Sequence, residues 1–261
     1  MHKSLSRRSL SIPYGIFMLL FIIAPLFLIV FYAFTDKTGA FTLSNFLNFF
    51  AEPSSISAFF YSIYVAIITT TCCLVIAYPV AYILSNEKYN KSKILIVLFI
   101  LPMWMNFLLR TLAIREMFFF LDFHLGEFTT ILGMVYNFLP FMILPIYTTL
   151  LKIDKSLIEA AQDLGATPGV VLKKVIFPLS IPGILSGVLM VFMPTISTFV
   201  ISDLLSGGRI QLLGNLINLN FTTGNNWYVG SAISLILLVL IGFTALISNK
   251  SDKSANGGGL W

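Results

Sequence analysis

The chain has 261 residues, of which 57% are hydrophobic and only 10% are charged, and its formal net charge is +5. A soluble domain of this length carries about 25% charged residues, so the composition excludes an ordinary water-soluble fold. The mean hydropathy of +0.92 is that of a protein made largely of membrane-crossing segments.

Charged residues are absent from six long stretches of the chain, and we interpret each stretch as a helix that crosses the membrane. About 20 apolar residues in a helix cross about 30 Å of hydrocarbon. Helices are favoured over strands because a backbone in lipid must satisfy its own hydrogen bonds. The sequence therefore predicts an all-α membrane protein with a six-helix transmembrane domain at 12–248, whose spans cover residues 12–34, 59–84, 93–112, 129–151, 178–202 and 228–248.

The two ends of the chain are polar. Arg7 and Arg8 precede the first apolar run, but this run is too long for a signal peptide and no small-residue cleavage site follows it, so we expect an uncleaved first helix. The first 11 residues are then a cytoplasmic segment. The polar, Gly-rich residues 249–261 are predicted to be a flexible cytoplasmic tail.

The distribution of Lys and Arg predicts the orientation in the membrane. Twelve of the sixteen basic residues fall on the side that holds both termini and the loops 85–93 and 152–177. The positive-inside rule places that side in the cytoplasm. The same rule accounts for the net positive charge without any nucleic-acid partner. The four basic residues on the other side are Lys37, Arg110, Arg115 and Arg209.

Residues that could support catalysis or bind a metal are few. Cys72 and Cys73 are adjacent in the middle of the second predicted span, where a packing role is expected. With only His2 and His124 in addition, no cluster has the spacing of metal ligands. The chain also has no Gly-rich phosphate loop and no nucleophile–base arrangement, so we expect a protein that is not itself an enzyme and that binds no cofactor.

The cytoplasmic loop 152–177 carries strong local signals for a helix–turn–helix. Ser156 followed by Glu159 fits a capping box at the start of a short helix. Gly165 stands where a left-handed residue ends a helix, and Thr167-Pro168 fits the start of the next. The predicted helix presents one apolar stripe with spacing i, i+3, i+4 and i+7, formed by Leu157, Ala160, Ala161 and Leu164.

The motif within this loop resembles a known family signature. The motif reads Glu159-Ala160-Ala161, three residues, Gly165, nine residues and then Val175-Ile176-Phe177-Pro178, and it is similar to the EAA loop of binding-protein-dependent ABC importer permeases. The family pattern ends in Ile-x-Leu-Pro, and here Val175 and Phe177 replace the Ile and the Leu. The resemblance implies the fold of these permeases and a coupling helix that docks on a cytoplasmic ATPase. The residues that it assigns to coupling are Glu159, Ala160, Ala161, Asp163, Leu164 and Gly165.

Three further segments resemble the PotB-like permeases of spermidine/putrescine importers. They are Leu101–Arg110, Tyr136–Tyr147 and Ser202–Gly208, and the similarity extends over about residues 12–248. This resemblance implies a polyamine substrate and a complex with a second, PotC-like permease, a PotA-like ATPase homodimer that binds ATP and Mg²⁺, and an extracytoplasmic PotD-like binding protein.

A pathway for a polyamine would need carboxylates between aromatic faces. Asp203 ends the uncharged fifth span and is the strongest acidic candidate, and the alternative is an interfacial acid paired with Arg209 or Arg110. Arg110 is expected to pair with an acid and fix a gate, and Asn106 is expected to be buried and hydrogen-bonded. Trp104 and Tyr136 are the aromatic candidates, with helix packing as the alternative for Trp104.

Other classes of membrane protein remain open at this point. A permease for a different small solute would share the architecture. A secondary transporter would be expected to carry ionisable residues near the middle of its spans, and the predicted spans hold none there. A structural or assembly protein with no transport role is a further alternative. Co-purification with an ATPase would distinguish a permease from it.

Overall fold

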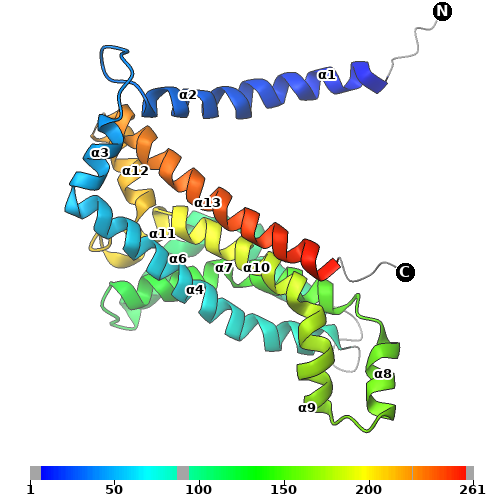
Figure 1. Ribbon diagram of the computed structural model, residues 1–261. Helices are drawn as coiled ribbons and strands as arrows, with labels where there is room; N and C mark the ends of the chain where they lie inside the picture. Colours follow the sequence, from blue (N-terminus) through cyan, green and yellow to red (C-terminus); the bar gives the residue numbers. More distant parts are fainter. Residues whose placement is uncertain (1–6, 87–93, 225, 257–261) are drawn as a thin grey trace, which may run out of the picture. The chain divides into compact units, whose positions relative to one another are not determined.

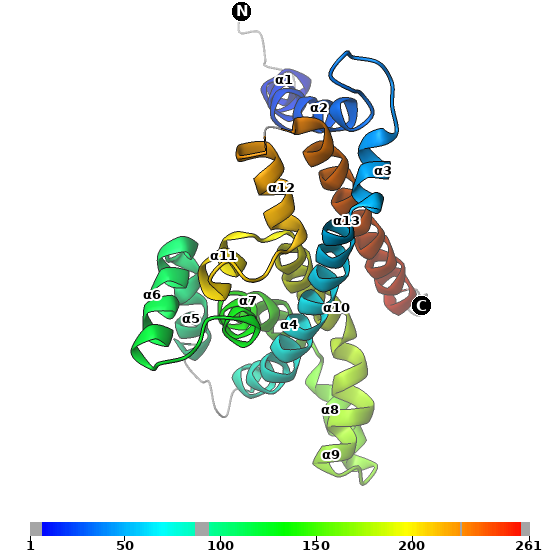
Figure 2. The same cartoon turned by 90° about the vertical axis from the view of Figure 1, so that its left-hand side faces the viewer.

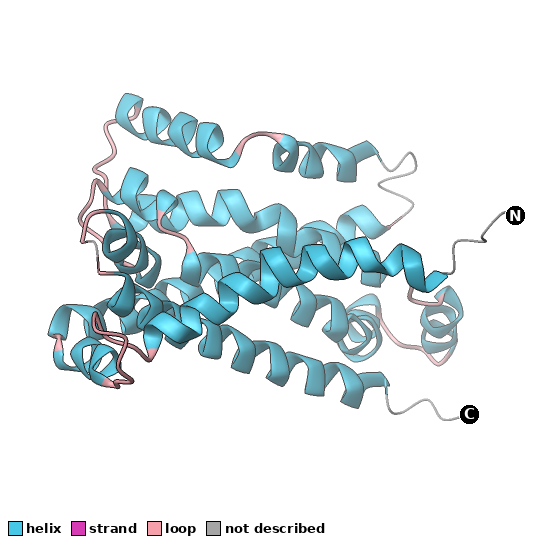
Figure 3. Cartoon of the chain, turned by 90° about the horizontal axis from the view of Figure 1, so that it is seen from above, coloured by secondary structure: helices cyan, strands magenta, loops and turns pink. Residues whose placement is uncertain are grey.

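The computed structural model describes residues 7–86, 94–224 and 226–256, which form helices joined by short loops (Figure 3). Within these ranges the only β-pairing is an isolated antiparallel bridge between Thr35 and Phe41. Five helices are long and apolar enough to cross a membrane, and one bent pair of helices makes a sixth candidate span. The predicted all-α architecture with six spans is therefore confirmed.

The chain divides into two compact units, Met1–Ser57 with Leu216–Val239 and Ala58–Asn215 with Leu240–Trp261. The described part of the first unit begins with α1 (Arg7–Met18), the π-helical turn η1 (Leu19–Ile23) and α2 (Ala24–Ala33), which follow one another without a break. It also holds α3 (Ser44–Ala51). Asn45 fixes the loop between α2 and α3, since its amide donates to the carbonyl oxygens of Ala33 at 3.0 Å and Thr35 at 2.9 Å.

The second unit is built around α7 (Glu127–Leu150). Helix α10 (Phe177–Ser197) packs along α7, and glycines allow the close approach: a Cβ added at Gly183 would lie 2.8 Å from the carbonyl oxygen of Pro145. The other helices of this unit are most of α4 (Pro53–Ser85), α5 (Ile94–Ile100), η2 (Leu101–Trp104), α6 (Phe107–Phe120) and α11 (Val200–Ser206). Helix α12 (Leu213–Thr222) begins here and ends in the first unit (Figure 1).

The start of the second span differs from the prediction. Helix α4 begins at Pro53, not near Phe59, so the Glu-Pro-Ser-Ser stretch is not a loop. Proline suits the first turn of a helix because the missing N–H has no intrahelical acceptor there. The amides of Ser55 and Ile56 donate to the carbonyl oxygen of Glu52 at 3.1 and 3.3 Å and complete that turn.

The third span was predicted to be continuous from 93 to 112, and this is wrong. Its described part consists of the segments Ile94–Trp104 and Phe107–Phe120, which are bent by 95° relative to each other. Met105 has an extended backbone, and the Asn106 side chain then accepts hydrogen bonds from the amides of Leu108 and Leu109, which starts α6 as an N-cap. Pro102 narrows the preceding turn to a 3₁₀-helix, so the sequence breaks the span instead of only kinking it.

The last two spans also differ at their ends. The fifth was expected to run from 178 to 202, but the helical segment covers Pro168–Ser197, and α11 follows as a separate helix after Thr198. The sixth, α13 (Trp227–Asn256), extends into the tail that composition predicts to be flexible. Residues 1–6, 257–261 and most of the predicted loop 85–93 lie outside the described residues.

Candidate functional site

The predicted helix–turn–helix is present at the end of α7. Helix α8 (Lys155–Asp163) follows α7 after four residues, and α9 (Pro168–Val171) continues through η3 (Leu172–Ile176) into α10. Figures 1 and 2 show α8 and α9 side by side at one end of the second unit. Only the first of the two predicted helices is free-standing, because the second is the beginning of the fifth span.

The cap of α8 is not the one predicted. Asp154 is the N-cap residue, and its carboxylate accepts a hydrogen bond from the Ser156 amide at 3.0 Å. The expected capping box between Ser156 and Glu159 is therefore wrong. Both residues already lie inside the helix, and an aspartate two positions earlier satisfies the first free amide equally well.

The end of α8 is the one predicted. Gly165 has a φ of +80°, in the left-handed region that favours glycine. Its amide donates to the Gln162 carbonyl at 2.8 Å, and the Ala166 amide donates to the Ala161 carbonyl at 3.0 Å. This pair of bonds is the Schellman motif, which satisfies carbonyl groups at the helix end and turns the chain sharply.

The predicted apolar stripe is divided between two faces of α8. Ile158 and Ala161 pack against the core of their own unit. Leu157 is 48% exposed and Leu164 is 89% exposed, and Ala160 between them is also exposed. We call Leu157, Ala160 and Leu164 the docking face, after the contact with an ATPase that is predicted for this helix. The face of α8 with Ile158 and Ala161 therefore packs against its own unit, whereas the docking face is exposed.

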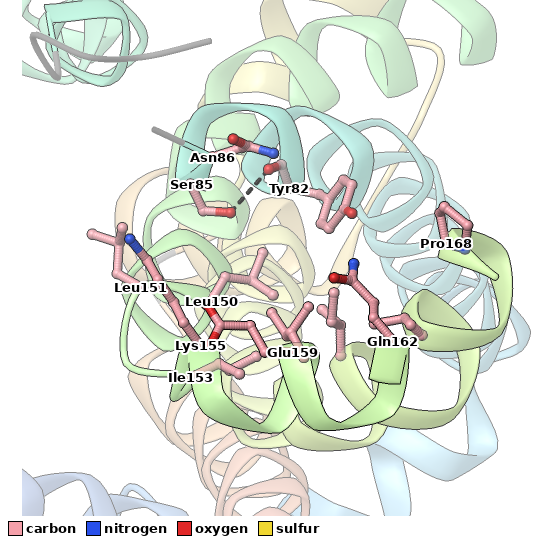
Figure 4. Close-up of a pocket in the computed structure, with 13 residues that line it drawn as sticks. Tyr82, Ser85, Asn86, Leu150, Leu151, Ile153, Lys155, Glu159, Gln162 and Pro168 are labelled. Carbon is pink, nitrogen blue, oxygen red and sulfur yellow. Dashed lines mark hydrogen bonds between the residues drawn. The ribbon is translucent and has the colours of Figure 1, made fainter. Parts of the chain in front are cut away.

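Two other residues of the predicted coupling motif, Glu159 and Asp163, occupy different environments. Glu159 lines a cavity of about 550 Å³ between α8, α9 and the ends of α4 and α7, together with Tyr82, Lys155 and Gln162 (Figure 4). Asp163 is the last residue of α8 and is exposed. Glu159 thus lies on the cavity side of the helix and Leu164 on the docking face.

Removing the Asp154 cap is expected to loosen α8. The amide and hydroxyl of Ser156 hold the pKa of the Asp154 carboxyl below its usual value. Its stabilising effect is therefore complete above the unfolded-state pKa, near 4, and is lost as the pH falls through the lower folded-state value. Asp154→Ala should speed hydrogen exchange of the α8 amides about fivefold at neutral pH. Asp154→Asn should retain the cap without the pH dependence, and an Ala variant with unchanged exchange would contradict the assignment.

Arg110 does not pair with an acid among the described residues, contrary to expectation. Its side chain is only 5% exposed, and its Nε donates to the Asn137 side-chain oxygen at 2.7 Å. One terminal nitrogen donates to the Pro102 carbonyl oxygen at 2.7 Å, and the guanidinium lies 5.8 Å from the centre of the Tyr136 ring. We call Arg110, Asn137 and the Pro102 carbonyl the bend latch, because they join α6 to α7 and to the segment before the 95° bend.

The corner of the bend places two predicted pathway residues at the surface of the chain. Trp104 is 85% exposed, which excludes packing within its own chain. Asn106 was expected to be buried, and this is wrong: it is exposed and caps α6. Because a new helix starts at Phe107, its first amides have no intrahelical acceptor, and those of Leu108 and Leu109 donate to the Asn106 side chain. Asn106 therefore needs no partner from another helix.

Asp203 lies on α11, where its carboxylate accepts a hydrogen bond from the Asn215 amide. The Asn215 oxygen in turn accepts from the Ser202 hydroxyl at 2.8 Å and the Leu212 amide at 2.9 Å. Asp203 is exposed, and its pairing with Arg209 or Arg110, the predicted alternative, is not found among the described contacts.

Sequence reasoning missed the two asparagines that organise these groups. Asn137 is fully buried in α7, and Asn215 follows the loop after α11. The available signal was an amide side chain within an otherwise apolar stretch, because a buried amide must find hydrogen-bond partners. The sequence does not show which residue each amide would contact.

Known proteins match almost the whole chain. Residues 3–254 match the family described as "Binding-protein-dependent transport system inner membrane component". The chain is 32% identical over 263 residues to the spermidine/putrescine transport system permease protein PotB of Escherichia coli K12, covering 92% of this chain and 95% of that protein. PotB of Haemophilus influenzae is 32% identical over 262 residues, covering 92% and 91% of the two chains.

Solved structures share the fold. A chain of the bacterial alginate ABC transporter in complex with its alginate-bound periplasmic protein has a TM-score of 0.73 at 14% identity, over 94% of both chains. A chain of the inward-facing MetNI methionine ABC transporter has a TM-score of 0.62 at 17% identity, over 77% of this chain and 95% of that one. Both confirm the importer-permease fold that the EAA-like motif predicts. The chain belongs to the inner membrane components of binding-protein-dependent transport systems, the multi-pass permeases of bacterial ABC importers.

Proposed function

We propose that this chain is the permease subunit of an ATP-driven importer that moves spermidine or putrescine across the bacterial inner membrane. The observation that carries the proposal is the similarity to PotB over nearly the full length of both proteins. The solved structures share the fold at 14% and 17% identity, and a fold-level likeness alone would not favour one solute.

The proposed assembly contains a PotC-like second permease, a PotA-like ATPase dimer and a PotD-like polyamine-binding protein. ATP and Mg²⁺ bind to the ATPase, and this chain holds no cofactor. The excess of Lys and Arg on one side supports the placement of both termini and α8 in the cytoplasm. The binding protein then delivers its solute to the opposite side of the membrane.

The docking face supports contact between α8 and the ATPase. Leu164 is 89% exposed, so a partner that covers it together with Leu157 and Ala160 would remove apolar surface from water and stabilise the contact. The helix has nine residues, too few to be stable alone, and it is held by Ile158, Ala161 and the turn at Gly165. A short helix fixed on one side and apolar on the other is suited to transmit movement from a partner's groove.

Transport would proceed by alternating access. Closure of the two ATPase subunits on ATP moves the docked α8 helices together, and the permease pair changes from inward-facing to outward-facing. ATP binds the two ATPase states with different affinity, and it can therefore bias the permease only through the contact at α8.

Of the candidate pathway residues, two are placed to meet the solute. Asp203 offers a carboxylate held by Asn215, and Trp104 offers an exposed ring face, so together they supply charge and cation–π attraction for an amine. Tyr136 is also exposed. We assign Arg110 and Asn106 to the shape of the bend, because their hydrogen bonds are directed into the chain itself.

Placing a charge on the docking face is expected to release the ATPase. Leu164→Glu should lower the amount of ATPase that purifies with the complex about tenfold, because a buried carboxylate in an apolar groove is costly. Gln162→Glu is the matched control, since it adds the same charge on the cavity side of α8. Pull-down from membranes measures the effect. Equal ATPase recovery for both variants would contradict the docking assignment.

The function itself is tested by reconstitution. The purified four-component complex in vesicles should take up radiolabelled spermidine only with ATP and the binding protein present. Uptake of another solute in place of any polyamine would identify a permease of the same family with a different substrate. Uptake driven by an ion gradient without ATP would identify a secondary transporter.

A further inference from the structure

The cavity beside α8 lies on the side of this helix that is turned away from the docking face. Its volume is about 550 Å³, and it is lined by α8, α9 and the ends of α4 and α7, all within the second unit (Figure 4). At 3.6 residues per turn, Lys155 and Glu159 point about 150° away from the mean direction of Leu157, Ala160 and Leu164. A partner groove that covers the docking face therefore does not fill this cavity.

The cavity lies where three membrane spans have their ends. Ser85 is the last residue of α4, Leu150 is the last of α7, and Pro168 is the first of the helical segment Pro168–Ser197. Helix α4 has 33 residues and that segment has 30, more than the roughly 20 that cross the hydrocarbon. Their ends therefore reach the layer of the lipid headgroups, and the cavity lies at that level.

The lining of the cavity combines both signs of charge with hydroxyl groups. Lys155 and Glu159 extend into it from α8, one helical turn apart (Figure 4). Tyr82 and Ser85 line it from α4. The Ser85 hydroxyl donates to the Tyr82 carbonyl oxygen at 2.9 Å, so the Ser85 oxygen remains an acceptor. The lining also includes the apolar side chains of Leu150, Val171 and Ile176.

A stabilising charge pair within α8 explains less of this arrangement. Opposite charges four residues apart stabilise a helix, but the order with the cation first, as in Lys155 and Glu159, is the less favourable one. Such a pair also needs no cavity. A space of this volume, with a few polar groups among apolar walls, is typical of sites that bind small molecules, which measure about 300–1,000 Å³.

The two charges match a molecule that carries both a phosphate and a primary ammonium group. Lys155 donates to a phosphate, and because its ammonium group has three N–H donors it can do so alongside a partner within the chain. The Glu159 carboxylate accepts from the ammonium group. A phosphoethanolamine headgroup carries both groups, and the apolar walls suit the glycerol and the first carbons of the acyl chains.

We propose that this cavity binds the phosphoethanolamine headgroup of a membrane lipid, with the phosphate at Lys155 and the ammonium group at Glu159. The lipid ties α8 to the ends of α4 and α7 and holds it from the side opposite the docking face. The site goes beyond the proposed solute transport, because it depends on the position of the cavity at the ends of the spans and not on the identity of the solute.

The test is the retention of lipid by the complete complex in detergent, measured by native mass spectrometry. The complex is given equal amounts of phosphatidylethanolamine and phosphatidylcholine with the same acyl chains. It should retain phosphatidylethanolamine about tenfold better, because the quaternary ammonium group of choline has no N–H to donate to Glu159. Glu159→Gln should bring the ratio of the two lipids close to one. Equal retention of the two lipids by the unaltered complex would overturn the site.

The phosphate contact is tested separately. Lys155→Gln should lower the retention of both lipids about tenfold. Lys173→Gln is the matched control, since Lys173 is exposed on η3 and does not line the cavity, and it should retain both lipids as before. Equal losses in the two lysine variants would contradict the assignment of the phosphate.

A variant on α4 decides the question if the α8 variants do not assemble with the ATPase. Ser85→Phe places a ring in the cavity without changing α8, and it should abolish the preference for phosphatidylethanolamine. An unchanged preference in this variant would place the lipid elsewhere and overturn the site.

The source of the headgroup is tested by competition. Glycerophosphoethanolamine, which has no acyl chains, should not displace the lipid at equal concentration. Displacement would show that a soluble phosphoethanolamine compound is the ligand and would overturn the assignment to a membrane lipid. Failure of the complex to import any polyamine, with its lipid preference intact, would overturn the proposed function and leave this site in place.

Discussion

Gly165→Val is expected to abolish coupled import, with uptake at least about tenfold below that of the unaltered complex. The φ of +80° at this position is accessible to glycine at little cost but is strongly unfavourable for a β-branched residue, by about 1–3 kcal/mol. The valine would force the chain out of the Schellman turn, so the hydrogen bonds that end α8 would be lost. The docking face would then no longer be held in one orientation.

Space is not the obstacle at this position. A Cβ added at Gly165 meets nothing within 4 Å, and the same is true at Gly169, which is helical. Gly169→Val is therefore a matched control, because it adds the same side chain without backbone strain and should import normally. Gly165→Asn should recover part of the activity, since asparagine tolerates the left-handed conformation better than valine does.

The measurement pairs uptake with ATP hydrolysis. Membrane insertion and copy number of Gly165→Val should match those of the unaltered chain, while substrate-stimulated hydrolysis should fall with uptake. Normal stimulated hydrolysis in the valine variant would show that the turn at Gly165 does not carry the coupling. Equal loss in Gly169→Val would assign the effect to side-chain bulk near α9 and not to backbone conformation.

The features that the sequence predicted correctly depend on local physics. The left-handed turn at Gly165 and the new helix at Thr167-Pro168 each follow from the conformational limits of one or two residues. The spans follow from the absence of charge over about 20 residues. Such signals act within a few residues of the chain and need no knowledge of what lies across the fold.

The predictions that were wrong have two causes. Either two neighbouring residues could fill the same local role, or the outcome depended on contacts between distant parts of the chain. The cap of α8 was assigned to Ser156, although Asp154 two residues earlier fills the same role. The division of the α8 stripe could not be predicted, because spacing places Ala161 and Leu164 on neighbouring positions and only the packing of the core decides which one is covered.

The prediction for Arg110 failed for a physical reason that has a consequence for function. A lone cation in an apolar stretch was expected to find a carboxylate, but it is bound to neutral oxygens of Asn137 and Pro102. Neutral acceptors satisfy the N–H groups without neutralising the charge, so burial remains costly. Because the free-energy cost of burying the Arg110 charge remains in the folded chain, we infer that Arg110 has a specific role. Its hydrogen bonds to Asn137 and Pro102 indicate that this role is to hold the bend.

Arg110→Ala is accordingly expected to destabilise the subunit by about 2–4 kcal/mol, because the Asn137 oxygen and the Pro102 carbonyl lose their donors and a cavity remains. The melting temperature in detergent should fall by about 5 °C or more, and uptake should fall with it. Arg115→Ala is the control on the same helix, where the guanidinium lies 5.3 Å from the Phe119 ring, and it should change stability by less than about 1 kcal/mol.

Two further variants separate a latch from a gate residue that meets the solute. Arg110→Lys keeps the charge but cannot reach both acceptors with one ammonium group, so it should remain destabilised. In a double-mutant cycle, Arg110→Ala and Asn137→Ala should be non-additive by more than about 1 kcal/mol, since each removes the same hydrogen bond. A lysine variant with full stability and an altered solute preference would instead assign Arg110 to the pathway, because only the charge, and not the geometry of the bend, would then matter.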